Sequence, residues 1–420
     1  MYHKNLYLDN AATTSVHPEV VNSMLPYFEN RFYNPSSLYS ESKKIKEDIN
    51  SARHTIADFI NAKDHEIFFT SGGSESNSWA IQGFSKMCWK TGNPFVIIHS
   101  SIEHHSIIEC CDNNSIVDSS DVVPVDAEGL IDIGLLENAV RNWSARTRMS
   151  VLVTIQLANN ELGTIQNIKE IANIVHRYNG ILHCDATQAF GHIPIDVKEL
   201  GVDMMTASGH KIHAPKGIGL LYIKESLNIQ PIIYGTQEGE RRGGTENVPY
   251  IIGFAKAVEL CKMYFEENRG YQARIRNYLW QKLRDTFGCT LNGSKTKRLP
   301  NNINITFPQN VTGEALIYML NTSRIFISAG SACNSMSDKP SHVLKAIGLS
   351  DRDAMRTIRI TLPDSYSDVS PYSYYDDKSN SEKIAIYNDK ISYEDIDYFI
   401  DEISKILRLL DIDERMNKGE

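Results

Sequence analysis

The sequence predicts an α/β protein with a large domain built on a mostly parallel, doubly wound sheet and a smaller α+β domain. Between residues 67 and 223, short apolar runs alternate with stretches of helical periodicity, which is the pattern of parallel strands joined by helices. Beyond residue 263 the chain instead mixes alternating strands with isolated helices. We therefore expect residues 14–263 to form the large domain, and residues 1–13 and 264–420 to form the small one.

Composition and charge are those of an ordinary globular protein, with 41% hydrophobic and 23% charged residues among 420. The net charge of −9 argues against a general nucleic-acid-binding protein. The first residues lack the features of a signal peptide and no apolar run is long enough to span a membrane, so we expect a cytoplasmic protein without membrane contact. The seven cysteines are scattered without a CxxC pair, which favours neither a disulfide framework nor a zinc site.

Before the sheet, the sequence predicts one short strand and two helices. The strand covers residues 6–10 and leads into small polar residues. The first helix is expected over residues 17–29, with Pro18 near its start, where proline is tolerated. The second is expected over residues 39–60, where apolar residues recur at helical spacing.

Polar residues follow strand after strand of the predicted sheet. The expected strands cover residues 67–69, 95–99, 150–158, 181–184, 204–207 and 220–223, and a helix is expected over residues 168–178. The residues that follow strand ends include Ser74, His104, Asn160, Asp185 and Lys211. The carboxyl ends of parallel strands lie at one sheet edge, where open α/β sheets bind their ligands. These five side chains therefore predict a single site.

Two of these residues keep alternative interpretations when each is taken alone. Lys211 is either a partly desolvated amine nucleophile at the sheet edge or a surface lysine on a turn. The strand–glycine–helix turn at Ser74 exposes backbone N–H groups and favours an anion such as phosphate, but a turn without a ligand has the same pattern.

The second half of the chain begins with a glycine-rich, basic loop over residues 235–245. A long helix is expected to follow over residues 247–267 and to join the two domains. In the small domain we expect strands over residues 302–307 and 325–327, and helices over residues 313–320 and 394–410. Residues 364–390 are rich in Ser, Asp, Tyr and Asn and predict an inserted loop.

One cysteine stands apart from the others. Cys333 lies in a run of small polar residues, 328–335, that suits an exposed loop, and we expect this loop to span residues 323–340. Exposure favours a reactive thiol, although an incidental exposed thiol would have the same surroundings.

A phosphate cradle, a carboxylate and a lysine at one sheet edge are the groups that pyridoxal 5′-phosphate (PLP) requires. Ser74 would bind the phosphate, Asp185 would pair with the ring nitrogen, and Lys211 would condense with the aldehyde. A metal site is a poor alternative because the histidines lack the HxxxH or HExxH spacing. A nucleotide site is also poor, because neither GxGxxG nor GxxxxGK[ST] occurs at a strand end.

A set of short motifs, in order along almost the whole chain, carries a family resemblance. They are residues 7–14 (YLDNAATT), 34–37 (NPSS), 70–77 (TSGGSESN), 103–104 (EH), 158–163 (ANNELG), 185–188 (DATQ), 208–211 (SGHK), 242–247 (RGGTEN), 330–333 (GSAC) and 340–344 (PSHVL). With these motifs the sequence resembles the group I cysteine desulfurases of the NifS/IscS kind, which are class V, fold-type I PLP enzymes. The resemblance implies a large domain with a mostly parallel, seven-stranded sheet between helices, and a small α+β domain.

The resemblance also implies a role for each site residue. Lys211 would bond covalently to PLP, His104 would stack on its ring and Asp185 would pair with its ring nitrogen. Further cofactor contacts are implied for Asn160 and Gln188 beside the ring oxygen and, around the phosphate, for Gly73, Ser74, Ser208, His210 and, from the second subunit of a homodimer, Thr245.

For the substrate, the resemblance implies that Asn34 and Arg359 bind the carboxylate of L-cysteine and that Cys333 accepts its sulfur. L-Alanine would leave, and the Cys333 persulfide would pass its sulfur to an acceptor protein for iron–sulfur cluster assembly, tRNA thiolation or another sulfur modification. Selenocysteine lyase or another class V aminotransferase reaction is an alternative. A non-catalytic scaffold is a second one, although it need not keep Lys211, Asp185 and Cys333 together.

The chain departs from the family after the strand that carries Arg359. The family normally enters its last helix within a few residues, whereas here residues 364–390 intervene. Basic and glycine residues expected after that strand are missing. We therefore expect a dedicated sulfur acceptor rather than the general housekeeping scaffold.

Overall fold

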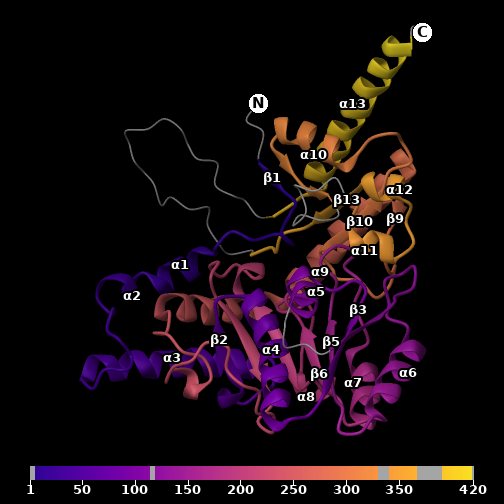
Figure 1. Cartoon of the computed structure of the whole chain (residues 1–420). Coiled ribbons are helices and arrows are strands. Elements are labelled where there is room, and N and C mark those ends of the chain that lie inside the picture. Colours follow the sequence, from indigo (N-terminus) through magenta and orange to yellow (C-terminus); the bar gives the residue numbers. More distant parts are fainter. Residues whose placement is uncertain (1–4, 114–118, 330–339, 367–389, 419–420) are drawn as a thin grey trace. The chain divides into compact units, whose positions relative to one another are not determined.

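The computed structural model describes residues 5–113, 119–329, 340–366 and 390–418 (Figure 1). Within these residues the chain divides into two compact units. The larger comprises Thr14–Asn160 and Thr164–Phe265. The smaller comprises the residues up to Thr13, Glu161–Gly163 and the residues from Glu266 onward.

Among the described residues, seven strands form the sheet of the larger unit, in the order β2-β8-β7-β6-β5-β3-β4. Their bounds are Ile67–Thr70 for β2, Phe95–Ser100 for β3, Ser120–Val123 for β4, Ser150–Gln156 for β5, Ile181–Asp185 for β6, Met204–Ser208 for β7 and Gly219–Ile223 for β8. The predicted mostly parallel sheet is confirmed. However, β8 runs antiparallel to both of its neighbours, because the connection from β7 is too short to hold a crossover helix.

Helices cover this sheet, with α4 on β7 and β8, α7 on β6, and α6 on β4 and β5 (Figure 1). Their bounds are Pro18–Met24 for α1, Pro26–Glu29 for α2, Ser40–Phe59 for α3, Gly73–Thr91 for α4, His105–Asp112 for α5, Ile133–Ser144 for α6, Ile168–Arg177 for α7 and Val197–Leu200 for α8. The single helix predicted over residues 17–29 is wrong. The chain breaks into α1 and α2 at Leu25, because Pro26 cannot donate a backbone hydrogen bond inside a helix and instead starts the next one.

The smaller unit has an antiparallel sheet in the order β12-β13-β10-β9, beside the parallel pair β1 and β11. The strands are β1 Leu6–Tyr7, β9 Thr290–Leu291, β10 Asn302–Thr306, β11 Ile325–Phe326, β12 Ser328–Ala329 and β13 Thr357–Thr361. The helices are α10 Gly313–Thr322, α11 His342–Ala346, α12 Asp351–Met355 and α13 Tyr393–Lys418. The mixture of short strands and isolated helices is that of an α+β unit.

The long helix α9 runs over Val248–Phe287, so the predicted end at residue 267 is wrong. Its second half carries a stripe of buried residues at a spacing of four: Tyr271, Ile275, Leu279 and Leu283. All four belong to the core cluster of the smaller unit. Because this stripe is buried, the helix continues past the predicted end at residue 267.

Both flanks of the predicted insertion are attached to one turn of α9. Gln272 Nε2 donates to Asp364 Oδ1 at 2.7 Å, and the backbone N–H of Ser365 donates to the Asn268 side chain at 2.7 Å. On the other flank, the Tyr271 hydroxyl donates to the carbonyl of Ile391 at 3.0 Å. The stretch between residues 367 and 389 lies outside the described residues. Its two flanks therefore leave and rejoin the smaller unit at neighbouring points of the same helix.

Gly163→Ala is expected to destabilise the smaller unit by about 3 kcal/mol. Gly163 has φ +75°, and a Cβ there would lie 2.7 Å from Asn302 Oδ1, so the change adds both backbone strain and a clash. Gly348→Ala is the matched control, because Gly348 has φ +91° but open space around its Cβ position. Denaturant unfolding should show the larger loss for Gly163→Ala; equal losses would contradict the clash.

Candidate functional site

The candidate site lies at the carboxyl edge of the parallel strands in the larger unit. β5, β6 and β7 are neighbours in register, with Asp185 beside Gln156 on one side and Thr206 on the other. β3 lies on the far side of β5 and ends just before His104. Because these four strands run in the same direction, the residues that follow them lie at one edge of the sheet.

Asp185 is buried at the end of β6, with 3% of its surface exposed. The Asn77 side chain donates to its Oδ2 at 2.9 Å, and the backbone N–H of Thr187 donates to its Oδ1 at 2.9 Å. These two hydrogen bonds fix the plane of the carboxylate. Sequence reasoning missed Asn77, although it lies one helical turn after Gly73, on the same face of α4, and that spacing is a usable signal.

His104 is linked to Asp185 through a chain of polar contacts. Asn77 Nδ2 also donates to Ser106 Oγ at 2.9 Å, and that oxygen lies 2.8 Å from His104 Nδ1. The backbone N–H of Ser106 donates to the same Nδ1 at 3.1 Å, so the ring is a neutral acceptor at this atom. Burial lowers the pKa of His104, Asp185 acts in the opposite direction, and Lys211 lowers it further. The imidazole is therefore neutral at physiological pH.

The turn that carries His104 is anchored by Glu103, which sequence reasoning did not single out. Glu103 is 1% exposed; its Oε2 accepts the backbone N–H of Gln156 at 2.9 Å, and its Oε1 accepts the hydroxyl of Ser100. Burial raises the pKa of Glu103 to about 8. A buried carboxyl group that bonds both β3 and β5 holds this corner of the sheet edge in place.

Lys211 lies at the end of a single 3-10 turn, Gly209–Lys211, that directly follows β7. Burial lowers the pKa of the neighbouring His210 to about 4, and the positive charges of Lys211 and Lys216 act in the same direction. Lys211 also interacts electrostatically with His104. Lys211 is thus half-buried and interacts electrostatically with two imidazoles at the sheet edge.

The first turn of α4 lies against the ends of two other strands. A Cβ on Gly73 would be 3.0 Å from Thr187 Oγ1 and 3.7 Å from Ser208 Cβ, so glycine allows the helix start to approach these side chains closely. The Oγ1 atom of Thr187 is buried and has no hydrogen-bond partner among the described residues. The first backbone N–H groups of a helix have no partner within the helix, and together with that hydroxyl they form a place where an anion can bind. Ser74 lies in the same turn.

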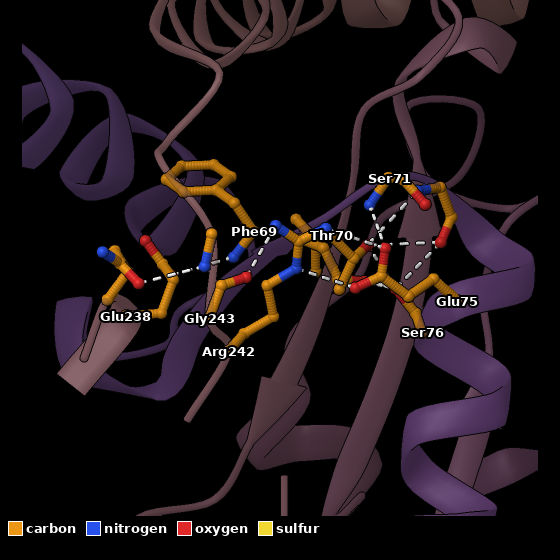
Figure 2. A network of polar contacts seen from close by, with 12 residues as sticks. Phe69, Thr70, Ser71, Glu75, Ser76, Glu238, Arg242 and Gly243 are labelled. Atoms are coloured by element: carbon orange, nitrogen blue, oxygen red, sulfur yellow. Dashed lines mark hydrogen bonds and ion pairs between the residues drawn. The ribbon is translucent and has the colours of Figure 1, made fainter. Parts of the chain in front are cut away.

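A pocket of about 140 Å³ lies beside this turn, on the side of the loop that precedes α9. Thr70, Ser71, Arg242 and Thr245 contribute to its lining. Figure 2 shows the polar contacts that join this loop to the residues around the start of α4. Thr245 itself is exposed.

The remaining expected residues are placed as follows. Gln188 is buried just after β6, and Asn160 follows β5, where Gln156 Nε2 donates to its side chain at 3.4 Å. Asn34 is exposed and accepts the backbone N–H of Ser36 at 2.9 Å within its own loop. Arg359 belongs to the smaller unit, where it is 2% exposed and forms an ion pair with Asp9 at 2.7 Å. Cys333 lies outside the described residues.

Across the described ranges of the chain, no group of three or more His, Cys, Asp and Glu side chains is arranged to bind a metal ion. A search of the same ranges also finds no helix with the length and hydropathy needed to cross a membrane.

Comparison with known proteins identifies the family. Residues 6–363 match the aminotransferase class-V family. The cysteine desulfurase IscS of Methanosarcina thermophila is 44% identical over 86% of this chain and 87% of its own length. This chain belongs to the aminotransferase class-V family, among the cysteine desulfurases of the IscS and NifS kind.

Solved structures agree with this assignment. A NifS-like protein superposes with a TM-score of 0.82 at 30% identity, over 97% of this chain and the whole of that one. A structure described as SspA in complex with cysteine superposes with a TM-score of 0.73 at 37% identity, over 86% of this chain and 99% of that one. The predicted fold and family are thus confirmed.

Proposed function

We propose that this chain is a PLP-dependent cysteine desulfurase that converts L-cysteine to L-alanine and passes the sulfur, as a persulfide on Cys333, to an acceptor protein. The observation that supports this most directly is the buried carboxylate of Asp185, with both oxygens held, at a sheet edge shared with His104 and Lys211. The similarity to a protein in complex with cysteine supports the same substrate.

The residues present fit PLP. The buried hydroxyl of Thr187 beside Gly73, which has no hydrogen-bond partner in the described part of the chain, suits a phosphate oxygen, and Ser74, Ser208 and His210 would complete that cradle. The buried Asp185 suits a protonated ring nitrogen, because an ion pair of that kind needs a carboxylate held away from water. Asn160 and Gln188 would lie beside the ring oxygen, as the family resemblance implies.

When bound, PLP supplies an electron sink for negative charge at the substrate's α-carbon. Lys211 Nζ would hold the cofactor and then move the α-proton, because it lies at the sheet edge that also carries His104 and Asp185. His104 would stack on the ring in its neutral form. Asn34 and Arg359 would bind the substrate carboxylate. Cys333 Sγ would then form an S–S bond with the substrate sulfur as the Cβ–S bond of the substrate breaks. Protonation of the substrate's Cβ would then lead to alanine.

We propose further that the enzyme is a cytoplasmic homodimer of the group I kind, with Thr245 reaching the phosphate bound by the other subunit. The exposure of Thr245 supports a contact outside its own protomer. The sulfur acceptor is expected to be a dedicated protein, because residues 364–390 set this chain apart from the common family pattern.

The test is a product assay on purified, PLP-loaded protein. With L-cysteine and a thiol reductant, we expect equal amounts of alanine and sulfide and an absorbance band near ~420 nm before substrate is added. Protein stripped of PLP is the control and should form neither product. Loaded protein that forms keto acid from cysteine without alanine or sulfide would sink the proposal in favour of transamination.

Asp185→Asn should lower the rate of alanine formation by about a hundredfold while PLP is still bound. The amide keeps the size of the side chain but removes the negative charge that would pair with the ring nitrogen. Asp203→Asn is the matched control, since Asp203 is another buried carboxylate, directly before β7, and accepts the backbone N–H of Leu182 near the start of β6. The control should lose stability but keep its rate; equal rate losses would contradict the role of Asp185.

A further inference from the structure

The loop formed by residues 234–247, which carries Thr245, is anchored to other elements of the larger unit by two ion pairs. In the first ion pair, Arg53 binds Glu238 in a bidentate way: Nη1 donates to Oε2 at 2.8 Å and Nη2 donates to Oε1 at 2.7 Å. The backbone N–H of Phe69 donates to the same Oε2 at 3.0 Å. The side chains of Arg53 and Glu238 are only 14% and 4% exposed, so this pair is shielded from water.

The second ion pair lies at the start of α4 (Figure 2). Arg242 donates from Nε to Glu75 Oε1 at 2.9 Å and from Nη2 to Glu75 Oε2 at 3.1 Å. The backbone N–H of Ser71 donates to that second oxygen at 2.7 Å. Bidentate guanidinium–carboxylate pairs fix the relative orientation of the two side chains as well as the distance between them. The loop is therefore held to β2 by Glu238 and to the first turn of α4 by Arg242.

The backbone between the residues that form these two ion pairs, Glu238 and Arg242, is strained. Glu238, Gly239 and Glu240 have φ of 48°, 63° and 65°, which is the left-handed region for three residues in a row. Residues other than glycine stay there only when the surroundings hold them in place. The loop also packs backbone against backbone, since a Cβ on Gly243 would lie 2.1 Å from the carbonyl oxygen of Tyr234.

The loop touches the opposite side of α4 from the one that faces the candidate phosphate position. Gly73 approaches Thr187 and Ser208, whereas Glu75 binds Arg242. Residues two apart on a helix point about 200° from each other. Thr245, at the end of the loop, is exposed, whereas the side chains of the two ion pairs are largely buried. A rigid loop that ends in an exposed hydroxyl, on this side of α4, suits a contact with a second copy of the chain.

We propose that Glu238 and Glu75 are positioning residues that hold the 234–247 loop so that Thr245 reaches the cofactor phosphate of the partner subunit. The proposal rests on the proposed function, which assigns Thr245 to that phosphate. Its consequence is specific. Loss of the Arg53–Glu238 ion pair weakens PLP binding in the neighbouring subunit and leaves the site of the altered subunit intact.

Hybrid dimers made by co-expression with two tags test this directly. In the first hybrid, one subunit carries Lys211→Ala and the other carries Glu238→Gln. In the second, one subunit is unchanged and the other carries both substitutions. Each hybrid has one intact Lys211, and borohydride trapping of PLP on that lysine over a range of PLP concentrations measures the affinity of that site alone.

We expect the first hybrid to bind PLP like a hybrid of unchanged and Lys211→Ala subunits. Its site with an intact Lys211 lies in the Glu238→Gln subunit and receives Thr245 from the intact loop of the Lys211→Ala subunit. The second hybrid should bind about tenfold more weakly. Both hybrids contain the same loop variant, so a folding defect would weaken them alike. Equal affinities, the reverse order, or a protein that forms no dimer would each overturn the proposal.

Glu240→Gln is the matched control. Glu240 has the same left-handed backbone and negative charge, but no ion pair of its side chain is present among the described residues. In the second hybrid this substitution should leave PLP affinity unchanged. The outcome is separable from the proposed function: unchanged protein that traps PLP but forms no alanine from cysteine would refute the desulfurase activity, while the order of affinities still tests the loop.

Discussion

Replacing Lys211 by alanine is expected to lower alanine and sulfide formation from cysteine by about a thousandfold or more. Lys211 ends the 3-10 turn that follows β7 at the site edge, where it interacts electrostatically with His104 and His210. In the proposed reaction it both holds PLP and moves the α-proton, so its removal deletes two functions at once. Borohydride reduction followed by peptide mass analysis should place PLP on Lys211 in the unchanged protein and on no lysine of the variant.

Lys216→Ala separates this role from a general effect of positive charge. Lys216 lies in the same connection between β7 and β8, is exposed, and also acts on the pKa of His210. Its removal should leave both the borohydride adduct and the turnover unchanged. A Lys211→Ala protein with full turnover, or an adduct on another lysine of the unchanged protein, would overturn the assignment of the site.

Sequence reasoning placed the site through strand ends, because buried parallel strands are easy to find and their polar successors share an edge. It could not find the contacts that hold those residues. Arg53 and Glu238 are separated by 185 positions in the chain, and nothing local in either segment indicates the other. Asn77 was within a quoted motif, yet its bond to Asp185, 108 positions away, depends on how α4 packs on the sheet.

The errors in the fold have the same origin. The strand β8 was recognised, but its direction depends on the length of the connection rather than on its own apolar run. The end of α9 was predicted too early, at residue 267, whereas the buried residues Tyr271 and Leu279 continue the helix into the smaller unit. Local signals give the type of an element, and tertiary packing decides how far it extends.

The chemistry of the cysteines leads to the second large prediction. Six of the seven cysteines lie within the described residues, and five of those six are buried. Burial raises the pKa of Cys111 and Cys289 to about 12 and also raises the pKa of Cys110 and Cys184. A thiol that stays protonated at neutral pH is a poor nucleophile toward the substrate's sulfur. These environments support the proposal that Cys333 is the sulfur acceptor.

Cys333→Ala is therefore expected to lower sulfide release by about a thousandfold while the absorbance near ~420 nm stays intact. The variant should still bind cysteine and exchange its α-proton with solvent deuterium, because that step needs Lys211 and not a thiol. Cys110→Ala is the control, since Cys110 is the only partly exposed cysteine among the described ones and should be dispensable. A Cys333→Ala protein with full turnover would instead favour a reaction in which the sulfur never bonds to the enzyme. Retained proton exchange with lost sulfide release would show that Lys211 and Cys333 serve successive steps, the first at the α-carbon and the second at sulfur.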